Sequence, residues 1–269
     1  MPHTMKVFAI AVALAALSAP LAGQEPRALR PDGQPDVQGA WRPVLGGTHS
    51  LDPVKSGAAD FQERITGVVK SNPSRIVDPP DGHIPYQPWA AALQKGLEAV
   101  YEKPTRPEHL DSQTRCIVDG PRLYYFPTFR ILQPQGSVVF VWDEYHAFRV
   151  VPLDGRPRVG ADIALWMGDG RGRWDGNTLV IETTNLKAKS RLDVVGDFYS
   201  DKARIVERFT FVDAKTLTYE ATITDPTVFT RPWTLRVAHR RMPDEEFWEW
   251  ACHEGERDAS HSSTGIDGK

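Results

Sequence analysis

Alternating apolar and polar residues dominate the second half of the sequence. The run at 137–153 (SVVFVWDEYHAFRVVPL) is rich in β-branched and aromatic residues, which favour strands. Asp175-Gly176 lies between two such runs and is a strong signal for a tight hairpin turn. The runs at 203–212 and 217–224, joined by the turn DAKT, predict a second hairpin.

Two further runs near the C-terminus, at 231–241 and 246–254, bring the predicted strands to about seven or eight. Short turns connect these strands, so neighbours in the sequence should pair antiparallel as a meander. A long twisted meander protects its edges best by closing on itself. We therefore predict an all-β fold with a lipocalin-like barrel at 116–255, and a two-layer β-sandwich is the alternative.

The segment at 24–115 differs in character, because prolines interrupt it repeatedly. One helix is predicted near 88–102, since Pro88 suits a first helical position and apolar residues follow at helical spacing. A shorter helix around 58–65 is a second candidate. We expect this Pro-rich segment to wrap over the outside of the barrel and to have no core of its own.

The first 23 residues (1–23) have the layout of a secretory signal peptide. Lys6 supplies a basic n-region, Val7–Leu17 is a continuous apolar run, and small residues surround Pro20 at the cleavage site. The apolar run is shorter than the ~20 residues that a membrane-spanning helix needs, so a membrane anchor is disfavoured. We expect cleavage near Ala22 or Gly23 and export to the periplasm or the medium.

Composition and short motifs exclude several classes of partner. The formal net charge is −3 and 25% of the residues are charged, with both signs mixed. No basic block interleaves with aromatic residues, so we expect no nucleic-acid partner. The stretch GDGRGRWDG opens no helix, no G-x-S-x-G elbow occurs, and HEG at 253–255 lacks the second histidine of a zinc-protease motif. We predict neither a cofactor nor a metal, and the oligomeric state stays open.

The chain contains two cysteines, Cys116 and Cys252. Thiols of exported proteins tend to oxidise, so we predict a disulfide between these two residues that pins the last strand. The chain-entropy model gives about 4–5 kcal/mol of stabilisation for closing so long a loop. Two buried free thiols are the alternative.

Strand phase points to one unusual carboxylate. In the run at 203–212, Glu207 alternates in phase with apolar residues, so it should face the interior of the barrel. A buried carboxylate must find a partner or become neutral. One interpretation pairs Glu207 with an interior arginine, Arg149 or Arg130, and the other makes it a general base or a ligand anchor. Glu220 is out of phase with its apolar neighbours and should face water.

The run at 137–153 supplies further polar candidates. If this run is one strand, Glu144 and His146 point to the same side, about 7 Å apart, in phase with Trp142. His146 is the best proton carrier among them, because an imidazole titrates near neutral pH. Surface charge at the end of a strand is the alternative for this pair. His253 is the next candidate.

The predicted site therefore combines polar groups with an aromatic lining inside the barrel. The catalytic or anchoring candidates are Glu207, His146 and Glu144, and the ligand-binding candidates are Trp142, Trp166 and Arg149.

Six short motifs stand out along the chain: TRCIVDGPR, DGRPRVG, WMGDGRGRWDGNTLVIETTN, VERFTFVDAKTLTYEATITDP, TRPWT and ACHEG. They resemble the motifs of a large family of secreted bacterial proteins with no assigned function. The resemblance covers roughly residues 41–255, is densest from Arg115 onward, and carries no activity, ligand or catalytic residue with it. Beyond it, residues 256–269 should form a mobile tail.

Two classes of function follow from these patterns. The first is binding of one small, largely apolar molecule inside the barrel. The second is an acid/base enzyme (a lyase, isomerase or hydrolase) that acts on a small organic substrate in the same cavity. Binding needs only a cavity, whereas catalysis also needs at least two converging polar groups. A third option is a carbohydrate-binding surface built from Trp41, Trp89, Trp166 and Trp248.

Overall fold

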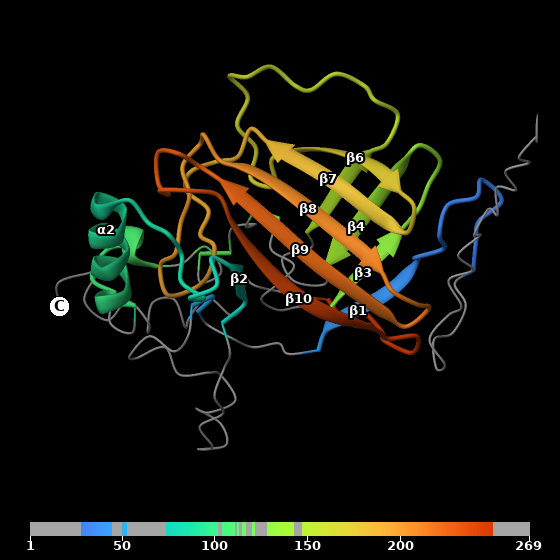
Figure 1. Cartoon of the computed structure of the whole chain (residues 1–269), viewed down its shortest axis with the longest axis horizontal. Helices are drawn as coiled ribbons and strands as arrows, with labels where there is room; N and C mark the ends of the chain where they lie inside the picture. Colours follow the sequence, from blue (N-terminus) through green and yellow to red (C-terminus); the bar gives the residue numbers. More distant parts are fainter. Residues whose placement is uncertain are drawn as a thin grey trace, which may run out of the picture.

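The computed structural model describes residues 28–44, 50–52, 74–101, 104–110, 112, 115–116, 120–121, 128–142 and 147–249. Ten strands of this part of the chain form one antiparallel sheet (Figure 1). They are β1 (Gly39–Pro43), β2 (Ile76–Asp78), β3 (Phe129–Leu132), β4 (Ser137–Trp142), β5 (Phe148–Pro152), β6 (Asp169–Asp175), β7 (Thr178–Thr184), β8 (Arg204–Phe211), β9 (Thr216–Thr224) and β10 (Trp233–Arg241). The described part also contains one α-helix, α2 (Pro88–Val100), and a short 3-10 helix, η1 (Pro107–His109).

The sheet closes into a barrel. Its strand order is β5-β4-β3-β1-β10-β9-β8-β7-β6, and β2 pairs with Thr234 and Leu235 near the start of β10. Strands β5 and β6, which end this path, lie next to each other, although no ladder pairs them among the described strands. We call this contact the seam. The predicted all-β antiparallel barrel is therefore confirmed.

Glycines of β6 allow the seam to close. A side chain at Gly172 would place its Cβ 2.7 Å from Leu153 Cδ2 and 2.9 Å from Val151 Cγ1, both on the β5 side. Such distances are too short for real atoms, so only a glycine leaves room for these apolar groups to pack against β6. The seam is thus filled by side chains in place of backbone hydrogen bonds.

Two predicted strand boundaries need correction. The first strand of the barrel, β1, precedes the predicted domain at 116–255 and forms ladders with both β3 and β10. Residues 246–249 were predicted to begin a last strand, but they form none. The physical reason is that β1 already occupies the edge of β10 on which a following strand would pair. The rest of that predicted strand, 250–254, lies outside the described residues.

The run at 137–153 is also two strands where one was expected. The chain reverses between Trp142 and Phe148, so that Phe140 pairs with Arg149 and Val141 pairs with Phe148. Cross-strand partners share a face. Arg149 therefore points inward and is buried, while Phe148 is 66% exposed. An outer cover over β5, which the predicted wrap would provide, is absent from the described part of the chain.

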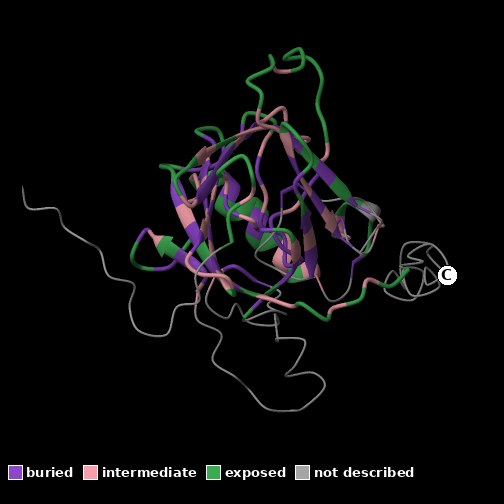
Figure 2. Cartoon of the chain, turned by 90° about the vertical axis from the view of Figure 1, so that its right-hand side faces the viewer, coloured by how far each residue is buried: buried purple, intermediate pink, exposed green. Residues whose placement is uncertain are grey.

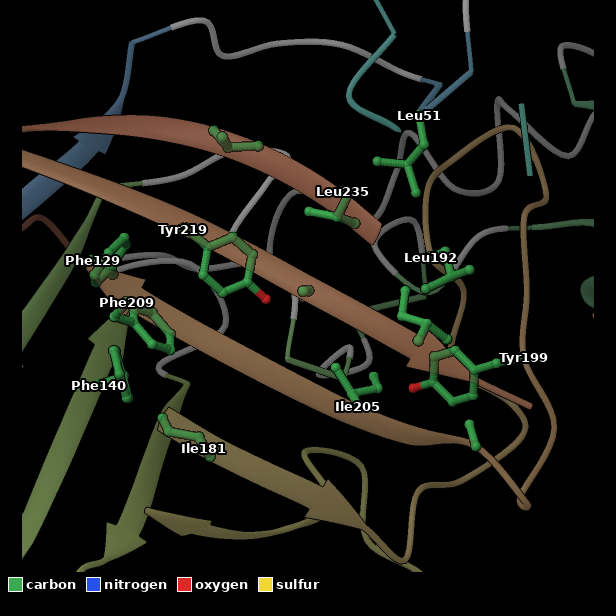
Figure 3. Packing of buried hydrophobic residues seen from close by; sticks show 14 of the residues in the cluster. Leu51, Phe129, Phe140, Ile181, Leu192, Tyr199, Ile205, Phe209, Tyr219 and Leu235 are labelled. Carbon is green, nitrogen blue, oxygen red and sulfur yellow. The ribbon is translucent and has the colours of Figure 1, made fainter. Parts of the chain in front are cut away.

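Apolar side chains fill the interior, as the alternation predicts. Strand β9 alternates strictly between buried and half-buried positions, and β8 does the same after its first residue. Aromatic rings meet at the centre, where Phe140 and Phe209 have centroids 5.1 Å apart and Phe209 and Tyr219 4.9 Å apart (Figure 3). The hairpins predicted at Asp175-Gly176 and at DAKT are both present.

Helix α2 lies across one end of the barrel, beyond the start of β8 (Figures 1 and 2). It begins at Pro88 as predicted and buries Ala90 and Gln94. The segment at 185–203, which connects β7 to β8, packs on this helix, since a Cβ at Gly196 would lie 2.6 Å from Leu97 Cβ. We call this covered end the mouth. The second helix predicted around 58–65, the signal segment and the tail at 256–269 lie outside the described residues.

Among the described helices, none combines the length and the apolar character that crossing a membrane requires.

Candidate functional site

A buried ion pair stands at the centre of the site. Glu207 on β8 faces inward between Ile205 and Phe209, as its phase predicts, and is 0% exposed. Arg149 donates to it twice, from Nη1 to Oε1 at 3.0 Å and from Nη2 to Oε2 at 2.6 Å. This bidentate geometry is the strongest arrangement of a guanidinium and a carboxylate.

Arg149 reaches Glu207 across the seam. It starts on β5 and passes Gly170 of β6, where a Cβ would lie 3.1 Å from its Nη2. Its Nη2 also donates to Thr183 Oγ1 of β7 at 2.6 Å. The bare backbone of β6 therefore makes room for a side chain that links β5 to β7 and β8.

Four hydrogen bonds occupy the Glu207 carboxylate. Tyr219 donates its hydroxyl to Oε1 at 3.1 Å, and the Thr183 hydroxyl donates to Oε2 at 3.3 Å, in addition to the two bonds from Arg149. A carboxylate has about four acceptor positions. The ionised group is thus fully satisfied where it lies, which favours the predicted ion pair over a general base waiting for a proton.

One N–H donor of Arg149, its buried Nε, has no hydrogen-bond partner among the described residues. An unsatisfied buried donor of this kind costs about 1–3 kcal/mol, so it calls for an explanation. The other arginine considered as a partner, Arg130, donates instead to the Glu245 carbonyl and stacks over Phe247.

Glu144, His146 and His253 lie outside the described residues, so their convergence on Glu207 stays a prediction. Glu144 and His146 were expected to share a face if 137–153 were one strand, whereas the chain reverses between β4 and β5.

The two predicted tryptophans lie in different surroundings. Trp142 points inward on β4 and stacks on Phe140 with centroids 6.1 Å apart. Trp166 is half-buried in the connection between β5 and β6, where the Lys187 ammonium lies 4.8 Å from its ring. Trp41 is buried inside the barrel with 1% exposure, so it cannot belong to the carbohydrate-binding surface that was considered as a third option.

Sequence reasoning missed three polar members of the interior, Thr183, Tyr219 and His239. Tyr219 was correctly placed in the inward set of β9 but was not considered as a donor. His239 is 0% exposed and meets the rings of Phe129 and Tyr219 edge-on, at 5.4 and 6.2 Å. Alternation along β10 (WTLRVAHRR) would have identified this histidine, because it is in phase with Leu235 and Val237.

A small cavity lies at the mouth, under the 185–203 segment. Its volume is about 10 Å³, close to the space that one water molecule occupies. Figure 3 shows Tyr199 of this segment beside Ile205 at that end of the core. The cavity is lined by Gly120, Pro121, Arg191, Leu192, Tyr199, Ile205, Ala221 and Ile223.

The cavity and the ion pair are neighbours. Ala221 of the cavity wall is the cross-strand partner of Glu207, and Ile205 precedes Glu207 by two residues on the same face. The inward residues of β9 are Leu217, Tyr219, Ala221 and Ile223. Ala221 has the smallest side chain of the four, so it leaves space in the interior that the larger side chains beside it would fill. The charged pair therefore adjoins the side of the cavity that Ile205 and Ala221 form.

Buried acids hold the cover of the mouth in place. Asp193 accepts hydrogen bonds from the backbone N–H groups of Gly196 and Asp197, and from that of Leu51. Asp197 accepts the Tyr86 hydroxyl at 2.9 Å. Burial and these two negative charges raise the pKa of Tyr86 well above its ordinary value. Tyr86 therefore stays a neutral donor that ties the segment before α2 to the cover.

Comparisons with protein-family models, with curated proteins and with solved structures found no match to this chain.

Proposed function

We propose that this protein binds one small, largely apolar molecule at the mouth of its barrel, in a lipocalin-like use of the fold. The observation that carries the proposal is the position of the cavity. Its floor is made of Ile205, Ala221 and Ile223, and a buried charged network adjoins that floor. Ligand sites are typically apolar hollows with a few polar groups that fix orientation.

The ion pair supports the same proposal. The bidentate pair of Arg149 and Glu207 is electrically neutral overall, and Glu207 lies opposite Ala221 of the cavity wall, so the pair favours a ligand that is neutral at this depth.

Binding of an organic ligand requires side chains of the 185–203 segment to move. The cavity of about 10 Å³ is much smaller than an organic ligand. Leu192 and Tyr199 reach it from the 185–203 segment, which is not part of the sheet. Displacement of these two side chains would enlarge the cavity without breaking a strand ladder.

The alternative is an acid/base enzyme, and the geometry supports it less well. A general base needs a free acceptor position, whereas Glu207 accepts four hydrogen bonds. Catalysis by Glu207 would require Arg149, Thr183 or Tyr219 to release it. The partner acids and bases proposed for it, Glu144 and His146, lie outside the described residues.

We also infer that the protein is exported after cleavage near Gly23, in keeping with the signal-like N-terminus and the resemblance to a secreted family. Intact-mass measurement on protein from the periplasm or the medium should give a mature chain that starts near Gln24. Full-length protein that remains in the cytoplasm would refute export and leave the binding proposal untouched.

Binding is tested with the neutral fluorescent probe N-phenyl-1-naphthylamine, whose emission rises in apolar surroundings. Ala221→Leu adds three carbon atoms to the cavity wall and should weaken probe binding by about tenfold or more, the effect of filling a well-packed site. Ala238→Leu on the exposed face of β10 is the matched control and should change nothing. Ala221→Gly, which widens the cavity, should retain binding.

The decisive contrast is between the two leucine variants. Equal probe affinity in Ala221→Leu, Ala238→Leu and the unaltered protein would show that the probe binds elsewhere and would refute the mouth as the site. Absence of any saturable probe signal in the unaltered protein would refute the proposal as a whole.

A further inference from the structure

One loop stands out from the barrel, at the top of both views, and carries apolar side chains on its surface (Figures 1 and 2). It lies between β5 and β6, and every residue of its stretch VGADIAL, 159–165, is exposed. The larger side chains in this stretch are Val159, Ile163 and Leu165, which are 37%, 45% and 37% exposed. We call residues 159–165 the apolar loop. Contiguous apolar surface of this kind marks interaction sites on proteins.

Hydrogen bonds hold the apolar loop in this exposed position. The Asn185 side chain donates to the carbonyl oxygens of Gly160 and Ile163, at 2.9 and 3.0 Å. The Ile163 N–H also donates to the Gly160 carbonyl, which closes a tight turn. Leu165 donates its N–H to the Asn185 carbonyl and accepts the Lys187 N–H. The backbone is therefore fixed before any partner arrives, and docking needs little further ordering of the chain.

An aromatic ring and two lysines lie at the base of the apolar loop. Trp166 follows the loop directly and is half-buried, and the Lys187 ammonium lies 4.8 Å from the centroid of its ring. Lys189, two residues further along, is exposed. Neither ammonium group forms an ion pair in the described part of the chain. Tryptophan and lysine are typical of the interfacial layer of a membrane, where the ring lies among headgroups and the ammonium reaches water and phosphate.

Positive charge exceeds negative charge around this base. Three acids beside it form ion pairs with arginines, namely Asp154 with Arg156, Asp169 with Arg171, and Glu182 with both Arg158 and Arg204. Glu108 is exposed and offsets the charge of Arg191, which donates to the Glu108 carbonyl. The exposed Asp162 in the loop offsets one of the two lysines. The second arginine at Glu182 and the other lysine remain, so the described surface here suits an anionic partner.

We propose that the apolar loop docks this protein on the surface of a phospholipid bilayer. Its apolar side chains enter the boundary of the hydrocarbon region, the Trp166 ring lies among the headgroups, and Lys187 and Lys189 contact lipid phosphates. A narrow loop can enter between headgroups, whereas a stable protein partner needs a broad surface of about 20–30 residues. The proposal goes beyond ligand binding in the cavity and does not depend on it.

The docking should be reversible and should respond to lipid charge. A few partly exposed side chains supply only weak insertion, and stable attachment to a membrane takes a second signal such as attraction to anionic lipid. Each lysine near an anionic surface strengthens binding about fivefold. Because Asp162 opposes the two lysines, we expect about a fivefold to tenfold preference for anionic over neutral membranes.

Sedimentation with sucrose-loaded vesicles measures this contact. Vesicles of phosphatidylcholine alone are compared with vesicles that contain about a quarter phosphatidylglycerol, in about 20 mM NaCl. The unaltered protein should pellet with both kinds and should show the stated preference for the anionic ones. Raising NaCl to about 500 mM should remove the preference and leave binding to phosphatidylcholine unchanged, since salt screens exposed charges.

Three variants separate the loop from the lysines. Ile163→Ser should weaken binding to both kinds of vesicle about fivefold, because it removes apolar surface that would leave water. Leu132→Ser is the matched control, since Leu132 on the outer face of β3 is 42% exposed against 45% for Ile163, and it should pellet like the unaltered protein. Lys189→Gln should weaken binding to the anionic vesicles alone. Circular dichroism confirms that each variant is folded.

The outcomes decide between membrane and protein as the partner. Unaltered protein that stays in the supernatant with both kinds of vesicle would overturn the proposal. Equal pelleting of Ile163→Ser and the unaltered protein would overturn it as well, because the contact would then lie elsewhere. Self-association in analytical ultracentrifugation that Ile163→Ser abolishes, without vesicle binding, would assign the apolar loop to an interface between copies of this chain. Binding of the naphthylamine probe without lipid is a separate measurement, so either proposal can fail alone.

Discussion

Arg149 on β5 and Glu207 on β8 form a bidentate ion pair inside the barrel, with 3% and 0% of their side chains exposed. The pair spans the seam, the place where the strands at the two ends of the sheet meet without a ladder. Side-chain hydrogen bonds from Arg149 therefore connect strands that backbone hydrogen bonds leave unconnected. We conclude that this pair both closes the barrel and places a polar group beneath the mouth cavity.

Glu207→Gln should destabilise the protein strongly. The change leaves the Arg149 guanidinium buried without a counter-charge, which typically costs about 3–5 kcal/mol. Glu220→Gln is the matched control, since Glu220 on the next strand pairs with Arg236 on the outer face with half-exposed side chains. That exposed pair is worth at most about 1 kcal/mol. Urea unfolding followed by circular dichroism measures both free energies.

A double variant tests the reason for that loss. Arg149→Met with Glu207→Leu removes both charges, and it should recover much of the stability because no buried charge is left unpaired. A free energy of unfolding for Glu207→Gln within about 1 kcal/mol of the unaltered protein would contradict a closing role for the pair.

Tyr86 should make stability fall at high pH. Its pKa is raised well above 10 in the folded protein, chiefly by burial and then by Asp197 and Asp193. The folded state therefore keeps the phenol neutral while the unfolded chain ionises near pH 10, so this contribution is present below that pH and is lost above it. The decline between about pH 9 and pH 11 should be steeper for the unaltered protein than for Tyr86→Phe.

The Tyr86→Phe variant also tests the hydrogen bond from the Tyr86 hydroxyl to Asp197. At pH 8 it should be less stable by about 1–3 kcal/mol, because the Asp197 carboxylate loses a donor and the Phe198 N–H loses an acceptor. Identical pH profiles for the two proteins would show that Tyr86 does not couple the cover to the segment before α2.

The disulfide between Cys116 and Cys252 remains a prediction. Cys116 is half-buried in a described turn, with a positive φ of 51°, while Cys252 lies outside the described residues. Peptide maps of the exported protein under non-reducing and reducing conditions should differ by one linked pair of peptides. Alkylation of both thiols in freshly isolated native protein, without prior reduction, would rule the bond out.

The sequence predicts one half of the buried pair and leaves the other undetermined. Glu207 could be placed inside from the alternation along 203–212 alone, because one side of that strand is uniformly apolar. Arg149 could not, since its phase depends on where the chain reverses after Trp142. A hairpin at that point moves every later residue of the run to the opposite face.

Two other features, the inward position of Thr183 and the presence of β1, could not be predicted from the sequence pattern. In β7 the residues Leu179, Val180 and Ile181 are all buried, so alternation is lost and the inward position of Thr183 could not be predicted. Strand β1 has five residues and ends at Pro43, which is too short for a periodic signal. Its place in the sheet is set by pairing with β3 and β10, which are distant in the sequence.

Binding at the mouth is tested most directly by NMR of protein labelled with carbon-13 in its alanine methyl groups. Titration with decanol should shift the Ala221 methyl resonance saturably, because this methyl forms part of the cavity wall, while the exposed Ala238 methyl should stay in place. Assignment follows from the Ala221→Gly and Ala238→Gly spectra. An Ala221 resonance that does not move up to the solubility limit of decanol, while the protein stays folded, would contradict the account.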